Sequence, residues 1–313
     1  MINRRNFLKN ASLLTLGGLV AGKAGNAQAA QSAAPVIEET TARKNIGLQI
    51  YSLGGELYKD VPGGMKKLKK MGYATLELAG YNNGKINGVE MMEFKKMADD
   101  AGLLITSSHV NPPVHEYTKD NLGKIKEFWK KTADDHAKIG VKYLVQPGQP
   151  STRSVEETQF VCEVFNEAGK IVNAAGFPFG YHNHDFEFAK VVPGGKGAKF
   201  DRHSKGEVIY NIFLKETDPS LVFFEMDVYW TVMGQNDPVE YLKKHPDRIK
   251  LLHIKDRAVL GESGMMNFES IFKQFYSNGY KDYFVELEGV PGGTQFEGVK
   301  GCADYLLKKS FVK

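Results

Sequence analysis

The most constraining feature of this 313-residue chain is a strand-like apolar run that recurs eight times and alternates with helical patterns. Runs of this kind are typical of parallel strands that are covered on both faces. Most of the intervening segments have apolar residues at helical spacing and end at a glycine, as many helices do. The predicted strands cover residues 46–51, 75–79, 103–109, 141–146, 179–184, 221–227, 249–254 and 283–288.

Eight parallel strands that alternate with helices can close into one barrel, for which about 250 residues are typical. The sequence therefore predicts an α/β fold with a single (β/α)8 TIM barrel over residues 45–313, after a polar linker at residues 31–44. The Gly- and Lys-rich residues 189–202 are predicted to form a loop over one face of this barrel. An open, doubly wound sheet is the main alternative. It is disfavoured because the chain has no Gly-rich phosphate loop.

The first thirty residues have a different pattern. Arg4, Arg5 and Lys9 precede an apolar stretch at residues 11–21, and a small-residue site follows at residues 27–29. This arrangement is typical of a secretory signal, and the paired arginines are similar to a twin-arginine signal. The apolar stretch is too short and too rich in glycine for a transmembrane anchor. The sequence predicts a twin-arginine-type signal peptide at residues 1–30, a periplasmic location and no stable membrane insertion.

Removal of that signal would leave a neutral chain. The whole sequence has 41 basic and 37 acidic residues, and residues 1–30 contain four basic residues and no acidic one. A neutral chain offers no general electrostatic footprint for nucleic acid or an anionic membrane. Cys162 and Cys302 lie far apart, each in a helical pattern, and are predicted to be small core residues. A disulfide is the alternative that export would permit.

Polar side chains stand near the ends of almost all the predicted strands. In a barrel of parallel strands these ends meet at one rim, where enzymes of this architecture carry their active sites. Burying so many polar groups without partners would be costly. The residues are Gln49, Tyr51, Glu77, His109, Gln146, His182, His184, Asp227, His253, Lys255, Glu286 and Glu288. We therefore predict a functional site at this rim.

Four of these residues, each near the end of a different strand, could form a metal site of two imidazoles and two carboxylates. They are His182, Asp227, His253 and Glu286. Such nitrogen and oxygen ligands suit Mn, Co, Zn, Fe or Mg better than calcium. A hydrogen-bonded polar ring without a metal is the alternative. Glu288 shares the strand face of Glu286, so the sequence leaves open which of the two is the ligand.

Residues 45–307 resemble the xylose-isomerase-like barrel superfamily of sugar isomerases and epimerases. The resemblance is carried by Tyr181-His182-Asn183-His184-Asp185-Phe186-Glu187-Phe188, Met226-Asp227-Val228-Tyr229-Trp230, Leu252-His253-Ile254-Lys255-Asp256 and Val285-Glu286. The metal ligands of ketose epimerases in this group are Glu, Asp, His and Glu. Asp227, His253 and Glu286 match the last three. His182 replaces the first Glu, which is one of two catalytic bases in those epimerases. The His-x-His pattern is more similar to the inosose dehydratase and 3-keto-glycoside lyase branches.

The resemblance implies a metal-dependent enzyme that acts on a sugar or keto-sugar through an enediolate, by dehydration or elimination. The expected catalytic residues are Glu286 as base, His184 as acid and Lys255 as a stabiliser of an enolate oxygen, although Lys255 could instead pair with Asp256. The expected substrate-binding residues are Tyr51, Glu77, His109, Gln146, Trp230, Arg257 and Glu288.

Two other functions remain open at this point. One is a plain ketose epimerase or aldose–ketose isomerase, and the other is a periplasmic sugar-binding barrel without catalytic activity. The expected partner in every case is a small carbohydrate and not nucleic acid, and a homo-oligomer is compatible with the sequence.

Overall fold

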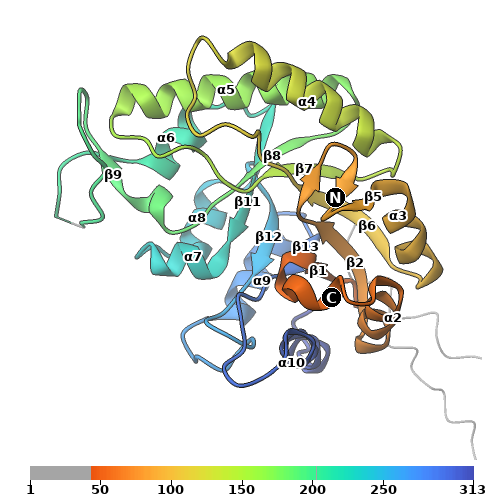
Figure 1. Ribbon diagram of the computed structural model, residues 1–313. Helices are drawn as coiled ribbons and strands as arrows, with labels where there is room; N and C mark the ends of the chain where they lie inside the picture. Colours follow the sequence, from red (N-terminus) through yellow and green to blue (C-terminus); the bar gives the residue numbers. More distant parts are fainter. Residues whose placement is uncertain (1–43, 202) are drawn as a thin grey trace, which may run out of the picture. The chain divides into compact units, whose positions relative to one another are not determined.

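The computed structural model describes residues 44–201 and 203–313, so the predicted signal peptide and nearly all of the linker lie outside the described residues. Eight parallel strands close into a barrel in the order β1-β13-β12-β11-β8-β7-β6-β2, with helices between them (Figure 1). This confirms the predicted (β/α)8 fold. The strands are β1 Ile46–Gln49, β2 Tyr73–Leu78, β6 Leu104–His109, β7 Tyr143–Gln146, β8 Phe179–His182, β11 Val222–Asp227, β12 Ile249–Ile254 and β13 Tyr283–Val285.

The helices surround the barrel (Figure 1). Their ends follow local signals in the sequence. The Asp60 side chain accepts a hydrogen bond from the Gly63 amide at the start of α2, and Gly72 ends that helix with a φ of 103°. Thr294 and Glu297 form a capping box at the start of α10. The helices are α1 Gly54–Leu57, α2 Val61–Met71, α3 Met91–Asp100, α4 Leu122–Ala137, α5 Val155–Ala174, α6 Ile209–Glu216, α7 Val228–Met233, α8 Pro238–Lys244, α9 Phe268–Ser277 and α10 Gln295–Lys308. Among the described residues, none of these helices has the length and apolar content that a bilayer-spanning segment needs.

The main core lies between the strands and the helices. Trp129 of α4 packs edge-on against Phe179 of β8, with their ring centroids 5.0 Å apart. Both cysteines are buried and free, so the prediction that they are small core residues is confirmed. Aromatic side chains of this size bury a large apolar area each and so contribute strongly to holding the helices onto the barrel.

Several segments differ from the sequence-based prediction. The residues expected to form a plain loop contain β9 (Lys190–Val191), which pairs antiparallel with β10 (Glu207–Val208). Residues 81–90 form an additional small sheet of three short strands, β3 (Tyr81–Asn82), β4 (Lys85–Ile86) and β5 (Val89–Glu90). Short 3-10 helices follow two of the barrel strands, η1 at Ile50–Leu53 and η2 at Phe186–Phe188.

Candidate functional site

The interior of the barrel is layered by the two-residue period of its strands. A small apolar cluster of Val145, Phe223, Leu251 and Phe284 lies inside the barrel. Two residues further along three of these strands come Glu225, His253 and Glu286, and the next inward positions are Asp227, Lys255 and Glu288. Because every second side chain along a strand faces inward, each of these three strands contributes one apolar residue and then two polar residues to the interior. The polar layers therefore lie towards the carboxyl ends of the strands.

The structure brings the four predicted metal ligands together. One nitrogen or oxygen of each of His182, Asp227, His253 and Glu286 lies within 4.8 Å of the others, and all four are buried. His182 Nε2 is 3.7 Å from Asp227 Oδ2, and His253 Nδ1 is 3.2 Å from Glu286 Oε2. Glu288 does not belong to this group.

Two of these side chains have atoms that could bind a metal and are not engaged in hydrogen bonds. Both ring nitrogens of His182 and the Oδ2 atom of Asp227 are buried and have no hydrogen-bond partner among the described residues. Asp227 Oδ1, in contrast, accepts a hydrogen bond from the Trp230 amide at 2.8 Å. Buried polar atoms without partners are rare, and they often mark an ion site. The donor set of two imidazoles and two carboxylates fits a divalent metal ion.

Below this cluster lies a second polar layer that holds the His253 ring. His253 Nε2 is 2.6 Å from Glu77 Oε2 and 3.4 Å from Glu225 Oε2, so its Nδ1 is the nitrogen that faces Glu286. Glu77 also accepts hydrogen bonds from Gln49 at 2.9 Å and from Ser107 at 2.6 Å. A carboxylate on the distal nitrogen of a histidine fixes its tautomer and its orientation towards a metal.

This second layer separates two residues that were expected to bind substrate, Glu77 and His109. Glu77 is fully buried under His253 and does not line the cavity above, so its contacts are those of a positioning residue. His109 lines that cavity, and its Nε2 lies 2.7 Å from Glu225 Oε2 while its ring stacks on His253 at a centroid distance of 4.9 Å.

Glu225 is the residue that sequence reasoning missed. It is fully buried in β11, and one of its carboxylate oxygens contacts His109. The signal is present in the sequence, because Glu225 lies two residues before Asp227 and so shares its face of the strand. The prediction considered only polar residues at the strand ends and so overlooked Glu225, which lies within the strand.

Burial and neighbouring charges set the protonation of the cluster. Burial, together with the nearby His253 and His109, lowers the pKa of His182 well below its usual value, so this ring is neutral and can donate a lone pair. Burial raises the pKa of Asp227 to about 7, against the opposing effect of Lys255. Burial also tends to lower the pKa of His253, but Glu225, Glu286 and Glu77 outweigh it and raise that pKa.

Lys255 is a buried cation at the edge of the cluster. Its side chain is 0% exposed, and its Nζ lies 3.2 Å from Glu286 Oε2 and 2.5 Å from Glu288 Oε1. The Nζ also lies 5.3 Å from the centre of the Trp230 ring, a cation–π distance. Burial tends to raise the pKa of Glu286, but His253 and Lys255 outweigh it and hold that pKa below its ordinary value. The predicted alternative, a pairing of Lys255 with Asp256, is not found: Lys255 pairs with Glu286 and Glu288, and both carboxylate oxygens of Asp256 accept backbone amides.

His184 lies beyond the end of its strand. The fifth strand was predicted to reach this residue, but β8 ends at His182 because the next backbone groups bond to side chains. The His184 amide donates to Glu187 Oε2 at 2.8 Å, and Asn183 Oδ1 accepts from the Asp227 amide at 3.3 Å. The His184 ring stacks on Phe186 with a centroid distance of 5.4 Å and lines the cavity. Burial lowers the pKa of His184.

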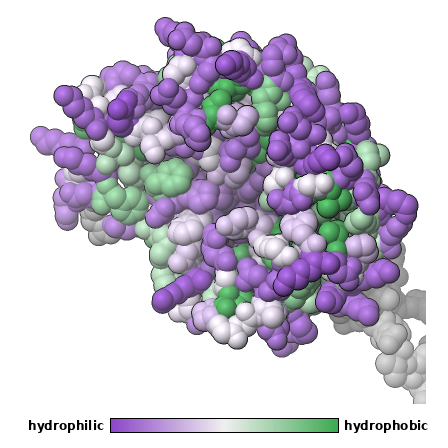
Figure 2. Space-filling view, in the orientation of Figure 1, coloured by the Kyte–Doolittle hydropathy of each residue, from purple (hydrophilic) through white to green (hydrophobic). Residues whose placement is uncertain are grey.

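A cavity of about 470 Å³ lies above the metal-ligand cluster, within the size range of small-molecule sites. Of the residues predicted to bind substrate, it is lined by His109, Glu288 and Tyr51, the last being 58% exposed. Gln146, Trp230 and Arg257 do not line it. Gln146 lines an adjoining cavity, Trp230 contacts Lys255, and Arg257 is exposed after β12. This face of the molecule has a central hollow whose visible walls are largely hydrophilic (Figure 2).

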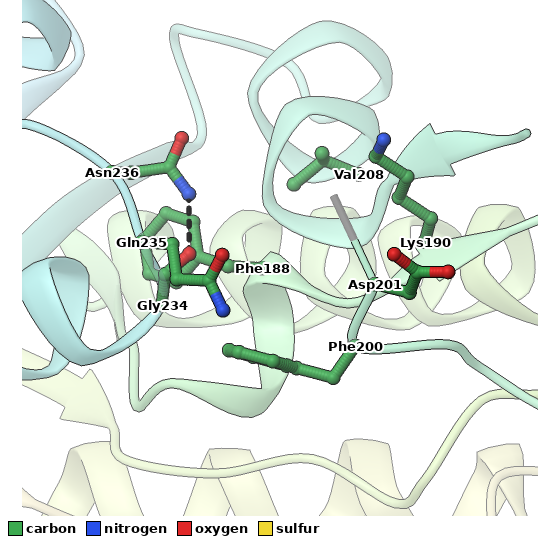
Figure 3. A pocket seen from close by; sticks show the side chains of 8 residues that line it. All are labelled: Phe188, Lys190, Phe200, Asp201, Val208, Gly234, Gln235 and Asn236. Carbon is green, nitrogen blue, oxygen red and sulfur yellow. Dashed lines mark hydrogen bonds between the residues drawn. The ribbon is translucent and has the colours of Figure 1, made fainter. Parts of the chain in front are cut away.

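Another cavity, of about 210 Å³, contains none of the predicted site residues. It lies beside the β9–β10 hairpin and is lined by Phe188, Lys190, Phe200, Asp201, Val208, Gly234, Gln235 and Asn236 (Figure 3). The Asn236 side-chain amide donates a hydrogen bond to the Gly234 carbonyl oxygen, at an Nδ2–O distance of 2.7 Å (Figure 3). This pocket shares no lining residue with the cavity above the metal-ligand cluster.

Comparison with known proteins agrees with this architecture. A crystal structure described as a sugar phosphate isomerase/epimerase from Parabacteroides distasonis is 60% identical, covers 86% of this chain and 100% of its own, and superposes with a TM-score of 0.82. The inosose dehydratase of Salmonella typhimurium is 32% identical over 103 residues, a match that spans 33% of this chain and 29% of the dehydratase.

A more distant structure shares the fold alone. The 3-keto-D-glucoside 4-epimerase of E. coli is 17% identical with a TM-score of 0.60, and the match covers 84% of this chain and 98% of that one. The family model of the xylose isomerase-like TIM barrel matches residues 65–301, which is more than half of the sequence. The chain therefore belongs to the xylose isomerase-like TIM barrel family.

Proposed function

We propose that this protein is a metal-dependent lyase that eliminates a group from a keto-sugar, such as the aglycone of a 3-keto-glycoside. The observation that carries the proposal is the convergence of His182, Asp227, His253 and Glu286 under a cavity, with His182 and Asp227 Oδ2 lacking partners among the described residues. Similarity to isomerases, epimerases and inosose dehydratases supports a carbohydrate substrate.

The four ligand residues would hold Mn, Co, Zn, Fe or Mg through nitrogen and oxygen atoms. A bound divalent ion supplies positive charge that stabilises the negative charge developing on a substrate carbonyl oxygen. Lys255 does not line the cavity, but its Nζ lies 3.2 Å from Glu286 Oε2 and would add positive charge beside the ion, which favours an enolate.

Proton transfer is assigned to His184. Its ring lines the cavity, and its Nδ1 has no hydrogen-bond partner among the described residues. Because burial lowers its pKa, His184 starts neutral and must accept a proton before it donates one. This changes its expected role from acid to base and then acid. The imidazole takes the proton from the carbon next to the carbonyl, the carbon–oxygen bond to the leaving group breaks, and the imidazolium returns that proton to the departing oxygen.

Plain epimerisation needs a second base on the opposite face of the substrate. His182 stands where a base would be expected from the epimerase pattern, and as a metal ligand its lone pair is committed. Glu286 pairs with the buried cation Lys255, which favours its ionised form and makes it a better ligand than base. These two positions favour elimination.

Incubation of methyl 3-keto-glucoside with the metal-loaded protein in D₂O, followed by NMR, is expected to show methanol release and an enone product. His184→Gln is expected to lower kcat by about 10²- to 10⁴-fold, the usual contribution of a positioned acid–base group. The variant should retain its metal content, because His184 is not among the clustered ligand atoms. Clean inversion at one carbon, without an enone, would contradict the proposal and favour the epimerase.

We also propose that the chain is exported through its twin-arginine motif. The change of both Arg4 and Arg5 to Lys keeps the positive charge but removes the arginine pair. Cell fractionation is expected to find the variant in the cytoplasm and the unchanged protein in the periplasm. Equal export of both would disprove the assignment.

A further inference from the structure

The cavity above the metal-ligand cluster does not end at the barrel mouth. A second cavity of about 420 Å³ adjoins it, and the two share Asn111. A third cavity of about 790 Å³ shares His115, Tyr117, Pro150 and Ser151 with the second. The three cavities therefore adjoin one another along the loops that follow β6 and β7, and the outer two are called the outer groove here. The inner cavity alone is of a size to hold one small ligand, so the outer two provide room for an additional group.

Three oxygen atoms in the wall of the outer groove can accept hydrogen bonds but have no donor among the described residues. Oε1 of Gln146, Oε1 of Gln149 and Oγ1 of Thr152 are buried and have no partner among the described residues. Gln146 and Thr152 are 1% and 6% exposed, and Gln146 Nε2 already donates to the Tyr117 hydroxyl at 2.6 Å. Buried acceptors without partners are costly unless a ligand satisfies them. Hydroxyl groups are the donors that would do so.

The charges of the groove disfavour an anionic group there. The third cavity is lined by three acids, Glu116, Glu156 and Glu157, against two bases, Lys119 and Arg153, and Arg153 already donates to Glu157 at 2.8 Å. The inner cavity is lined by Glu286 and Glu288, both of which pair with the buried Lys255. A phosphate in the third cavity would meet more negative than positive charge. The aromatic side chains of Tyr117 and Phe160 provide apolar surface beside the polar wall.

We infer that the outer groove binds a second, uncharged sugar ring, so that the substrate is a keto-disaccharide and not a sugar phosphate. This inference rests on the proposed function, because the ring in the inner cavity is the one that reacts. The second ring places its hydroxyls against Gln146, Gln149 and Thr152. A sugar leaving group would then depart along the groove.

The junction of the inner and second cavities offers a specific test. An added Cβ at Gly148 would meet only the Asn111 amide, at 3.9 Å, which is an ordinary contact. Gly148→Leu should therefore fold, and its side chain would lie beside Asn111 at the point where the two cavities meet. Gly123→Leu is the matched control, because Gly123 is exposed on α4 and its added Cβ meets nothing within 4 Å.

Turnover of a 3-keto-glucosyl-glucose disaccharide is compared with turnover of methyl 3-keto-glucoside and its 6-phosphate. Gly148→Leu is expected to lower kcat/KM for the disaccharide at least tenfold more than for the methyl glycoside, mainly through KM, because about two hydrogen bonds of ordinary strength are lost. Gly123→Leu should leave both values unchanged. An equal loss for both substrates in Gly148→Leu, or a preference of the unchanged protein for the 6-phosphate, would overturn the inference.

Calorimetric titration with unoxidised cellobiose and methyl glucoside separates this inference from the proposed reaction, because it needs no turnover. Tighter binding of cellobiose, lost in Gly148→Leu and kept in Gly123→Leu, supports the outer subsite even where no elimination occurs. Elimination from the methyl glycoside with equal binding of both sugars supports the reaction and rejects the subsite. Tighter binding of phenyl glucoside than of cellobiose would reject the second sugar in favour of an aryl group.

Discussion

Asp227→Asn is expected to lose the metal ion and to lower kcat by about 10³-fold or more, while the barrel stays folded. The Oδ2 atom lacks a partner among the described residues and lies 3.7 Å from His182 Nε2, so its charge serves the ion and not the fold. The amide keeps the Oδ1 acceptor for the Trp230 amide. Loss of several kcal/mol of charge stabilisation, at about 1.4 kcal/mol per tenfold, gives the expected magnitude. Metal content after dialysis, keto-glycoside turnover and thermal unfolding measure the three effects.

The unfolding measurement has its own expected direction. Burial raises the pKa of Asp227 to about 7, so ionising it in the metal-free protein is costly. The neutral amide removes this cost, and the metal-free variant should be at least as stable as the unchanged protein at about pH 8. Asp256→Asn is the matched control, because both oxygens of Asp256 accept amides, from Arg257 at 2.7 Å and Gly261 at 2.9 Å. It should lose stability and keep its metal. Full metal occupancy in Asp227→Asn would reject the metal site.

The inward-facing residues of the strands could be predicted because every second side chain along a strand faces the barrel interior. Phe223, Glu225 and Asp227 occupy successive inward positions of β11, and the same step relates Leu251, His253 and Lys255 at β12. The sequence alone thus places the polar groups above an apolar layer. Glu225 escapes a prediction that treats an apolar run as one continuous strand, because such a run hides a charged residue in its middle. An inward carboxylate within the run is itself the signal of an interior polar layer.

Other features depend on contacts that no period encodes. The strand β8 stops at His182 because Glu187 and Asn183 bond to nearby backbone amides, a side-chain effect that an apolar pattern cannot reveal. The outer groove lies between two loops and has no repeating pattern. The small sheet at residues 81–90 was not predicted, although the sequence contains a signal for it. Two Asn-Gly pairs at residues 83–84 and 87–88 have positive φ values, and this dipeptide is a strong signal for tight hairpin turns.

Glu187→Gln is expected to stabilise the protein by an amount that grows between about pH 4.5 and pH 8. Glu187 is fully buried, and burial raises its pKa from 4.5 to about 8 against the hydrogen bonds from Tyr181 and the His184 amide. Below pH 4.5 both the folded and the unfolded chains hold the proton, so burial of the acid has no titration cost. Between the two pKa values only the folded chain holds it, so the unchanged protein loses stability as pH rises. At about 1.4 kcal/mol per pH unit the upper limit of this loss is about 5 kcal/mol.

Urea unfolding at a series of pH values measures the difference between the two proteins, in which the titration of all other groups cancels. Tyr181→Phe sharpens the test, because the Tyr181 hydroxyl donates to Glu187 and favours its ionised form. In the presence of Glu187, loss of that hydroxyl should raise the folded-state pKa of Glu187 further, so the fall in stability should continue to a higher pH with the same slope. Combined with Glu187→Gln, the same change should cost a constant amount at every pH, because no titrating acid remains beside it. A stability difference between the unchanged protein and Glu187→Gln that stays level from about pH 4.5 to pH 8 would mean that Glu187 is ionised in the folded protein. It would then anchor the His184 turn as a carboxylate and not as a neutral acid.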